Sequence, residues 1–280
     1  PVGALLDKDF LFAQRVWFMS QTPSIDGITA SGDNIWVFHN EGRVYRLKPR
    51  TNKDVNKWWI SDEIRYGWKF VHSDDRLRSP MRMQYGVQVE CDWTRAYQDI
   101  HENFSKAIKE NGKGTLALLV SPMLTCEEAH LLVKFIRELD DQAIVGIGPI
   151  PIQGEDKTFP GGYTVSKEKC PNSRGIWRVL SAAVGEGNVL DYDAFIAKLS
   201  DKESTIDGVV LTGNYPSAWP TKELTGALKK MFVVAIDTLP NDITAKANVL
   251  LPGATWVEKT GTFENVQNRL QSFDQAIPVI

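Results

Sequence analysis

The apolar positions of this chain follow two different spacings, which change near residue 81. In residues 23–80, polar and apolar side chains alternate in short runs, and Asn34 to His39 and Arg43 to Lys48 are two of these runs. Asn40-Glu41-Gly42 separates them, and Asn and Gly supply the positive φ that a tight hairpin requires. The pattern predicts a small sheet built around a hairpin.

After residue 81, short apolar runs alternate with helical stripes, which is typical of a doubly wound α/β fold. Asp92 is a predicted N-cap, and Thr125 with Glu128 three residues later is a predicted capping box. Residues 148–172, rich in Gly and Pro, are predicted to form a long loop. The predicted elements are a connecting strand at 81–90, helices at 93–111, 125–139, 172–184, 192–199 and 221–228, and strands at 115–121, 143–147, 207–212, 231–237 and 248–251.

Composition limits the partners and the site chemistry. The net charge of −3 lacks the basic excess that nucleic-acid binding normally needs, so we expect no nucleic-acid partner. No apolar run reaches the length needed to span a bilayer, so we expect no direct membrane insertion. Cys91, Cys126 and Cys170 are widely spaced, which argues against a disulfide framework and against a four-thiolate metal site.

Four positions have the spacing of a cluster-binding motif, but none of them is cysteine. Asp26, Thr29, Asp33 and Ser61 stand at the spacing C-x2-C-x3-C-x27-C. A [4Fe-4S] cluster requires thiolate ligands, and carboxylate and hydroxyl oxygens are hard donors that do not replace them. Binding of another metal by Asp26, Asp33 and His39 is disfavoured, because no histidine stands at ligand spacing. We therefore expect no metal here, and a loop filled by side chains that hydrogen-bond to their own backbone.

The sequence around these four positions resembles a known family. Thr22 to Ile25, Asn34-Ile35 and Trp59 to Glu63 are similar to the segments that surround the cluster in molybdopterin oxidoreductases. Pro1 to Leu5 and Gly42 to Arg50 are similar to the large iron–sulfur subunit (G-type, 75 kDa-like) of NADH:quinone oxidoreductase, or complex I. Mitochondrial members of that subunit family also lack these cysteines.

The end of the chain resembles the same family. Ala247 to Glu258 and Gly261 to Asn265 are similar to a signature of its molybdopterin-oxidoreductase-like region. The resemblance implies a tether at 1–22 that follows a missing upstream Fe-S domain, then a degenerate cluster-wrapping β domain at 23–80. A reduced α/β domain with a doubly wound, mostly parallel sheet is expected at 81–280.

A second candidate site lies where two predicted strands end. Gly213-Asn214 follows one strand and Asp237-Thr238 follows the next. Ligands of α/β sheets bind beyond such carboxyl ends, and the resemblance implies that a similar Gly-Asn contacts the pterin nucleotide in molybdopterin enzymes. No Gly-x-Gly-x-x-Gly or P-loop pattern is present, so we interpret these four residues as strand ends kept without the cofactor. Cys170 is interpreted as a small hydrophobic residue or a surface thiol rather than as a molybdenum ligand.

The resemblance implies a redox-inactive scaffold within complex I. We expect Fe-S clusters in the upstream domain and none in this chain, and no catalytic residue is identified. The expected partners are the upstream domain and the other peripheral-arm subunits, and Phe10, Phe12, Trp17 and Phe18 are expected to contact the upstream domain. The implied location is peripheral, on the cytoplasmic side of the bacterial inner membrane or the matrix side of the mitochondrial one.

Two alternatives stay open. The C-terminal signature is compatible with a reduced molybdopterin-dependent oxidoreductase that resembles formate dehydrogenase. The segment from Pro1 to Leu5 is also similar to diaphorase subunits, so the chain could belong to an NAD-linked hydrogenase or formate dehydrogenase complex. The sequence around Ser61 favours complex I over both.

Overall fold

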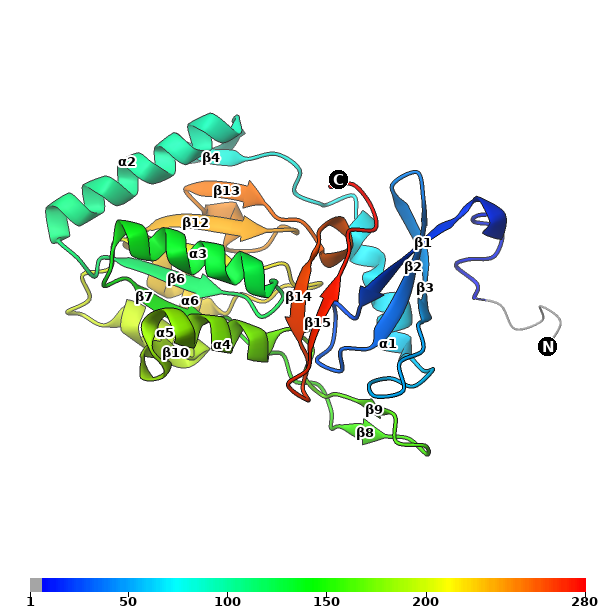
Figure 1. The fold of residues 1–280 in the computed structure, drawn as a ribbon. Helices are drawn as coiled ribbons and strands as arrows, with labels where there is room; N and C mark the ends of the chain where they lie inside the picture. Colours follow the sequence, from blue (N-terminus) through cyan, green and yellow to red (C-terminus); the bar gives the residue numbers. More distant parts are fainter. Residues whose placement is uncertain (1–6) are drawn as a thin grey trace.

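The computed structural model describes residues 7–280, so the Pro1 to Leu5 segment used in the resemblance lies outside the described residues. An eight-stranded sheet with helices on both faces lies beside a three-stranded antiparallel sheet (Figure 1). This mixture of a large, mostly parallel sheet and small antiparallel sheets confirms the predicted α/β fold class.

The large sheet has six parallel strands, extended at one edge by an antiparallel hairpin. In spatial order its strands are β10 (Val189–Leu190), β7 (Ile144–Ile147), β6 (Leu116–Val120), β11 (Gly208–Thr212), β12 (Phe232–Asp237), β13 (Val249–Pro252), β4 (Met81–Gln84) and β5 (Val87–Glu90). The direction of winding reverses between β6 and β11, so the topological switch point lies at their carboxyl ends. The prediction of a single connecting strand at 81–90 is wrong, because Tyr85 and Gly86 turn at φ 51° and 81°.

Alternate side chains of the central strands contribute to two cores. Leu116, Leu118 and Val120 of β6 belong to one core, and Ala117 and Leu119 belong to the other. A strand buried on both faces reads as a continuous apolar run, which is the pattern found in the sequence.

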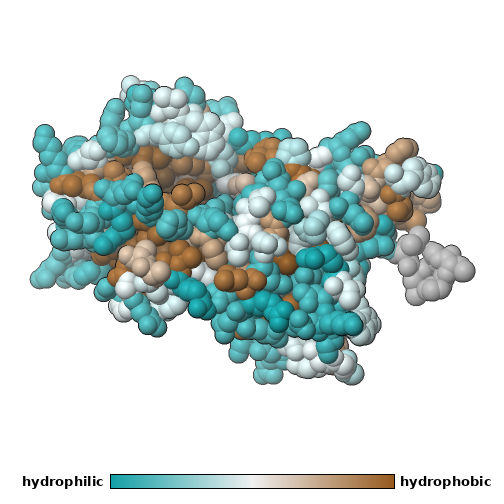
Figure 2. Space-filling model, viewed as in Figure 1, coloured by the Kyte–Doolittle hydropathy of each residue, from teal (hydrophilic) through white to brown (hydrophobic). Residues whose placement is uncertain are grey.

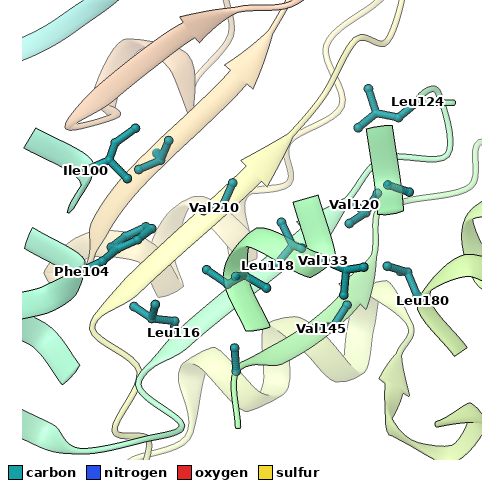
Figure 3. Close-up of a cluster of buried hydrophobic side chains, with 14 of the residues drawn as sticks. Ile100, Phe104, Leu116, Leu118, Val120, Leu124, Val133, Val145, Leu180 and Val210 are labelled. Atoms are coloured by element: carbon teal, nitrogen blue, oxygen red, sulfur yellow. The ribbon is translucent and has the colours of Figure 1, made fainter. Parts of the chain in front are cut away.

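Helices from different parts of the chain cover the two faces. The first face is covered by α2 (Trp93–Asn111), α3 (Cys126–Leu139) and α4 (Ser173–Val184), and the second by α5 (Tyr192–Ser200) and α6 (Lys222–Ala227). Figure 3 shows the first core, in which side chains of these helices meet the central strands.

The helix ends follow the capping signals in the sequence. Asp92 accepts a hydrogen bond from the backbone N–H of Arg95 at 2.7 Å, and α2 ends at Gly112 with φ 83°. Thr125 and Glu128 form the reciprocal capping box at 2.9 and 3.2 Å. These bonds satisfy N–H groups that an uncapped helix start leaves free, so the predictions for both helices are confirmed.

The small sheet is a meander of β1 (Ser20–Ile25), β2 (Asn34–Asn40) and β3 (Arg43–Pro49). The predicted hairpin is present, but its positive-φ positions are Glu41 and Gly42, at 48° and 75°, and not Asn40. Short helix α1 (Asp62–Tyr66) follows this sheet.

The C-terminal hairpin returns to the small sheet (Figure 1). It consists of β14 (Gly261–Glu264) and β15 (Leu270–Phe273). Phe263 and Phe273 lie 4.6 Å apart between ring centroids and share a core with Ile35 of β2. Segments far apart in the sequence therefore build one core.

The expected division at 1–22, 23–80 and 81–280 stays a prediction. β1 begins at Ser20, and residues 256–277 contribute to the core of the small sheet. The loop at 148–172 contains a further short hairpin, formed by β8 (Lys157–Thr158) and β9 (Thr164–Val165). Within residues 7–280, no helix combines the length and the apolarity that crossing a membrane requires.

Candidate functional site

Three of the four positions with cluster-ligand spacing lie at the turn between β1 and β2, and the fourth lies at the start of α1. Asp26 follows β1, Asp33 precedes β2, and the backbone N–H of Asp26 donates to the carbonyl of Asp33 at 2.8 Å. Thr29 lies in the turn between them, and its hydroxyl donates to Asp26 Oδ2. Ser61 caps α1 by accepting from the N–H of Ile64 at 3.3 Å.

Asp26 is held by the turn that it begins. Its Oδ1 accepts from the N–H groups of Ile28 at 2.8 Å and Thr29 at 3.2 Å, which is the local side-chain-to-backbone bonding predicted for this loop. The carboxyl group is fully buried, and burial raises its pKa to about 7 in spite of these hydrogen bonds. This group therefore titrates near neutral pH.

Asp33 has weaker compensation for its burial. Its Oδ2 accepts from the Tyr163 hydroxyl at 2.6 Å, and its pKa is raised to about 8 by burial and then by the charge of Asp26. Burial and the neighbouring Asp33 also raise the pKa of Tyr163, so the phenol stays a hydrogen-bond donor. At neutral pH the pair therefore keeps at least part of its protons.

Tyr163 also connects this polar core to the fourth position. Together with Ser61, Trp59 and Phe159 it lines a cavity of about 400 Å³ beside the β8–β9 hairpin. The long loop thus contributes a hydrogen-bond donor to the polar core and lines a cavity together with Ser61.

The residues present do not fit a [4Fe-4S] cluster. All four side chains offer hard oxygen donors, and both carboxylates are already bonded within the protein. The C-terminal segment also closes over the turn, since a Cβ on Gly32 would lie 2.5 Å from Asn265 Cβ. Among residues 7–280, no three His, Cys, Asp or Glu side chains are grouped as ligands of a metal ion. The arrangement can bind and release protons at its carboxyl groups.

In the second candidate site, Asn214 and Thr238 both donate hydrogen bonds to Asp237. Its Oδ1 accepts from the N–H groups of Asn214 at 2.7 Å and Thr238 at 2.8 Å. Its Oδ2 accepts from Trp219 Nε1 at 2.9 Å and Asn241 Nδ2 at 2.8 Å. Burial raises the pKa of Asp237. The carboxyl group therefore braces the ends of β11 and β12 through four N–H donors.

Protein side chains fill the space beside this brace. Tyr215 is buried at the switch point, where its hydroxyl donates to the carbonyl of Pro149 at 2.7 Å. Its ring lies 5.5 Å from that of Trp219, and a Cβ on Gly213 would lie 2.0 Å from Asp237. The cavity lined by Asn214 measures about 10 Å³, which is room for about one water molecule. A pterin nucleotide does not fit this space.

The comparisons with known proteins agree with both halves of the resemblance. Residues 19–69 match the family described as NADH-ubiquinone oxidoreductase NDSU1/NuoG-like, 4Fe-4S domain, and residues 177–280 match the family Molybdopterin oxidoreductase. The chain is 30% identical over 152 residues to the NADH-ubiquinone oxidoreductase 75 kDa subunit of Reclinomonas americana, covering 54% of this chain and 21% of that protein. It is 32% identical over 145 residues to the mitochondrial 78 kDa subunit of Candida albicans, covering 51% and 20%.

The chain is similar to the 75 kDa and 78 kDa subunits of NADH-ubiquinone oxidoreductase. The G-type NADH-quinone oxidoreductase protein of Rickettsia felis is 29% identical over 139 residues, which cover 50% of this chain and 20% of that protein. The chain thus spans about a fifth of the length of the curated relatives that it matches.

A solved structure supports the fold of this chain. Acetylene hydratase from Pelobacter acetylenicus superposes with a TM-score of 0.62 over 92% of this chain and 66% of that chain, at 8% sequence identity. At this identity the likeness concerns the fold alone.

The C-terminal segment that matches the family Molybdopterin oxidoreductase has a structural role here. Glu258 caps a short helical turn by accepting from the N–H of Thr255 at 2.6 Å, and it forms a buried ion pair with Arg76 at 2.9 Å. Asn265 donates to the carbonyl of Ser31 at 3.2 Å, beside the former cluster positions. These residues connect the end of the chain to its first sheet.

No feature of the sequence identifies Tyr163 or Trp219 as residues of the candidate sites. Tyr163 lies 130 residues from Asp33, and no local pattern marks that pairing. Cys170, expected to be a hydrophobic residue or a surface thiol, is buried, and burial raises its pKa. It packs with Met123 and is a core residue.

Proposed function

We propose that this chain is a redox-inactive scaffold region of a complex I large iron–sulfur subunit. It supports an upstream electron-carrying domain, docks other peripheral-arm subunits, and contributes to NADH:quinone electron transfer only within the assembly. Its location is peripheral, on the cytoplasmic face of the bacterial inner membrane or the matrix face of the mitochondrial one. The observation that carries the proposal is the hydrogen-bonded core of Asp26, Thr29, Asp33 and Tyr163 at the ligand positions. Oxygen donors in this arrangement exchange protons and provide no redox centre.

The docking role is supported by an exposed apolar arm before β1. Phe12, Trp17 and Phe18 are 89%, 74% and 61% exposed. Figure 2 shows hydrophobic residues at the surface of this end of the molecule, on the right of the view. Phe10 of the same arm is anchored, since the guanidinium of Arg46 lies 4.3 Å from its ring centroid. An anchored segment that presents large apolar side chains to solvent is typical of a protein contact, and we assign it to the upstream domain.

Cofactor analysis of this chain tests the proposal. The chain is purified without oxygen, and iron, sulfide, molybdenum, tungsten and released pterin are measured. We expect none of them in stoichiometric amount. Iron with sulfide would contradict the scaffold function, and molybdenum or pterin would favour an oxidoreductase.

The second candidate is a reduced molybdopterin-dependent oxidoreductase. It is favoured by the match of residues 177–280 and by two buried oxygens without a protein partner within residues 7–280, Asn214 Oδ1 and Thr238 Oγ1. The packing of Tyr215 and Trp219 at the switch point disfavours it. The third candidate, a subunit of an NAD-linked hydrogenase or formate dehydrogenase complex, is separated by the identity of the proteins that co-purify.

A further inference from the structure

The outer face of the small sheet carries three cations in a row. Arg46, Lys48 and Arg50 alternate along and just beyond β3, so their side chains point to the same side. Leu47, between the first two, points to the opposite side and is buried in the core. Same-face positions of a strand are spaced by roughly 7 Å, so the three residues form a ladder along the strand. The charged groups of Arg46 and Lys48 both lie near Phe38.

Aromatic rings hold these cations in place. β2 and β3 pair Phe38 with Arg46 and Trp36 with Lys48. The Arg46 guanidinium lies 4.6 Å from the Phe38 centroid, and the Arg50 guanidinium lies 5.8 Å from the Trp36 centroid. Lys48 Nζ lies 5.6 Å from Phe38. Cation–π contacts of this kind restrict the long side chains, which lowers the entropy that a partner must overcome.

The ladder has no acidic partner in the described part of the chain. Within residues 7–280, neither Arg46, Lys48 nor Arg50 forms an ion pair, whereas Lys169 pairs with Glu63 at 2.7 Å. The Nε atoms of both arginines are buried and lack a hydrogen-bond partner among the same residues. The pKa of Lys48 is lowered, first by partial burial and then by the charges of Arg46 and Arg65. Added negative charge at this face would relieve that repulsion.

We propose that Arg46, Lys48 and Arg50 dock an extended, carboxylate-rich segment of a neighbouring protein. This inference rests on the proposed scaffold function and names the surface and the chemistry of one contact. Alternate residues of an extended segment repeat at roughly 7 Å, as the three ladder residues do along the strand, so a carboxylate-rich segment running beside the strand brings its carboxylates within reach of these long side chains. Arg50 already donates from Nη2 to Asn34 Oδ1 at 2.9 Å, so a carboxylate binds its remaining N–H groups through charge-assisted hydrogen bonds.

A single-stranded nucleic acid fits the same face less well. Such strands bind where bases stack on free aromatic faces. Here Phe38 and Trp36 have cations over their rings, so those faces are covered.

Peptide binding to the whole chain tests the proposal. The probe is a short labelled peptide of alternating glutamate and valine, and its affinity is measured by fluorescence anisotropy at several salt concentrations. We expect binding that weakens with salt, no binding of the same peptide with glutamine for glutamate, and weaker binding of oligothymidylate. Lys48→Glu should weaken binding about tenfold or more, and Lys48→Arg should retain it.

Lys106→Glu is the matched control, because Lys106 is an exposed cation on α2, away from the small sheet. It should leave the affinity unchanged, and thermal unfolding should show that all variants are folded. The proposal is overturned if the native chain does not bind the acidic peptide. It is also overturned if Lys48→Glu binds like the native chain, or if oligothymidylate binds as tightly as the peptide. None of these results would change the cofactor analysis, so the scaffold function is tested separately.

Discussion

The two buried aspartate sites differ in how the protein compensates for burial. Asp237 accepts four N–H hydrogen bonds, two to each oxygen, at the carboxyl ends of parallel strands. Asp33 accepts a hydrogen bond from Tyr163 and lies close enough to Asp26 for each ionisation to oppose the other. Burial raises the pKa of the carboxyl group at both sites. At Asp237 four donors hold the carboxyl group in place, whereas at Asp33 the neighbouring charge of Asp26 raises the pKa further.

The difference follows from what surrounds each place in the fold. At the carboxyl ends of β11 and β12, the backbone N–H groups of Asn214 and Thr238 both donate to Asp237, which favours a single compact set of hydrogen bonds. In the turn between β1 and β2, Ile28 and Thr29 donate to Asp26, whereas Asp33 accepts from Tyr163 and also faces the charge of Asp26, so its pKa is raised further.

The largest expected effect is the loss of the brace. Asp237→Ala leaves the indole N–H of Trp219 and the N–H of Asn214 without their acceptor, so we expect a loss of about 3 kcal/mol or more in the free energy of unfolding. Urea denaturation measures it. Asp242→Ala, at an exposed carboxylate in the following turn, is the control and should change stability by less than about 0.5 kcal/mol. A loss below about 1 kcal/mol in the Asp237 variant would show that Asp237 does not brace the strand ends.

A smaller effect is expected from pH. The folded pKa values of Asp26 and Asp33, about 7 and 8, lie above the ordinary value of 3.8. A carboxyl group that ionises less readily when folded stabilises the fold fully below pH 3.8, and this contribution is lost as the pH rises through the folded pKa. We therefore expect the free energy of unfolding to fall from about pH 4 to about pH 8, by more than about 1 kcal/mol.

Asp33→Asn separates this effect from other titrations. The amide keeps an acceptor for Tyr163 and cannot ionise, so denaturation at a series of pH values should show a flatter curve. An unchanged slope in this variant would assign the pH dependence to other groups.

The Tyr163 hydroxyl should contribute less to the free energy of unfolding than the hydrogen bonds of Asp237. Tyr163→Phe removes the donor to Asp33 and keeps the ring, so we expect a loss of about 1 to 2 kcal/mol. Tyr97→Phe, at a tyrosine that is 56% exposed, is the control and should be close to neutral. If both variants have the stability of the native chain, Tyr163 does not hold the polar core together.

The smallest effect on stability is expected in the apolar arm. Trp17→Ala removes a side chain that is 74% exposed, so unfolding should change by less than about 0.5 kcal/mol. Its effect should appear in assembly, as weaker co-purification with the upstream domain and neighbouring subunits. Normal assembly of this variant would contradict the assigned contact.

Much of the fold can be predicted from short-range features of the sequence. The caps at Asp92 and Thr125 and the continuous apolar run of β6 are short-range features, and they predict the helices, the strands and the α/β class. The turn bonds of Asp26 are local too, which is why a side-chain-filled loop could be expected there.

The rest depends on contacts between distant segments. Tyr163 reaches Asp33 across 130 residues, and the β14–β15 hairpin completes a core that begins with β1. No periodicity encodes such pairings, because each segment alone is compatible with several partners. The hairpin at 81–90 escapes prediction for a different reason, since Tyr85 is not a residue that usually marks a positive-φ turn.

Direct titration of the buried carboxyl groups tests whether Asp26 and Asp33 are protonated near neutral pH. Carbon-13 NMR of aspartate carboxyl groups, assigned with Asp26→Asn and Asp33→Asn, follows each group as the pH changes, with and without added ferrous iron and sulfide. We expect Asp33 to be mostly protonated at pH 7, with an apparent pKa of about 8, and its signal not to respond to iron. An Asp33 carboxyl group that is already ionised at low pH would contradict this expectation. So would the loss of the Asp26 or Asp33 signal when iron is added.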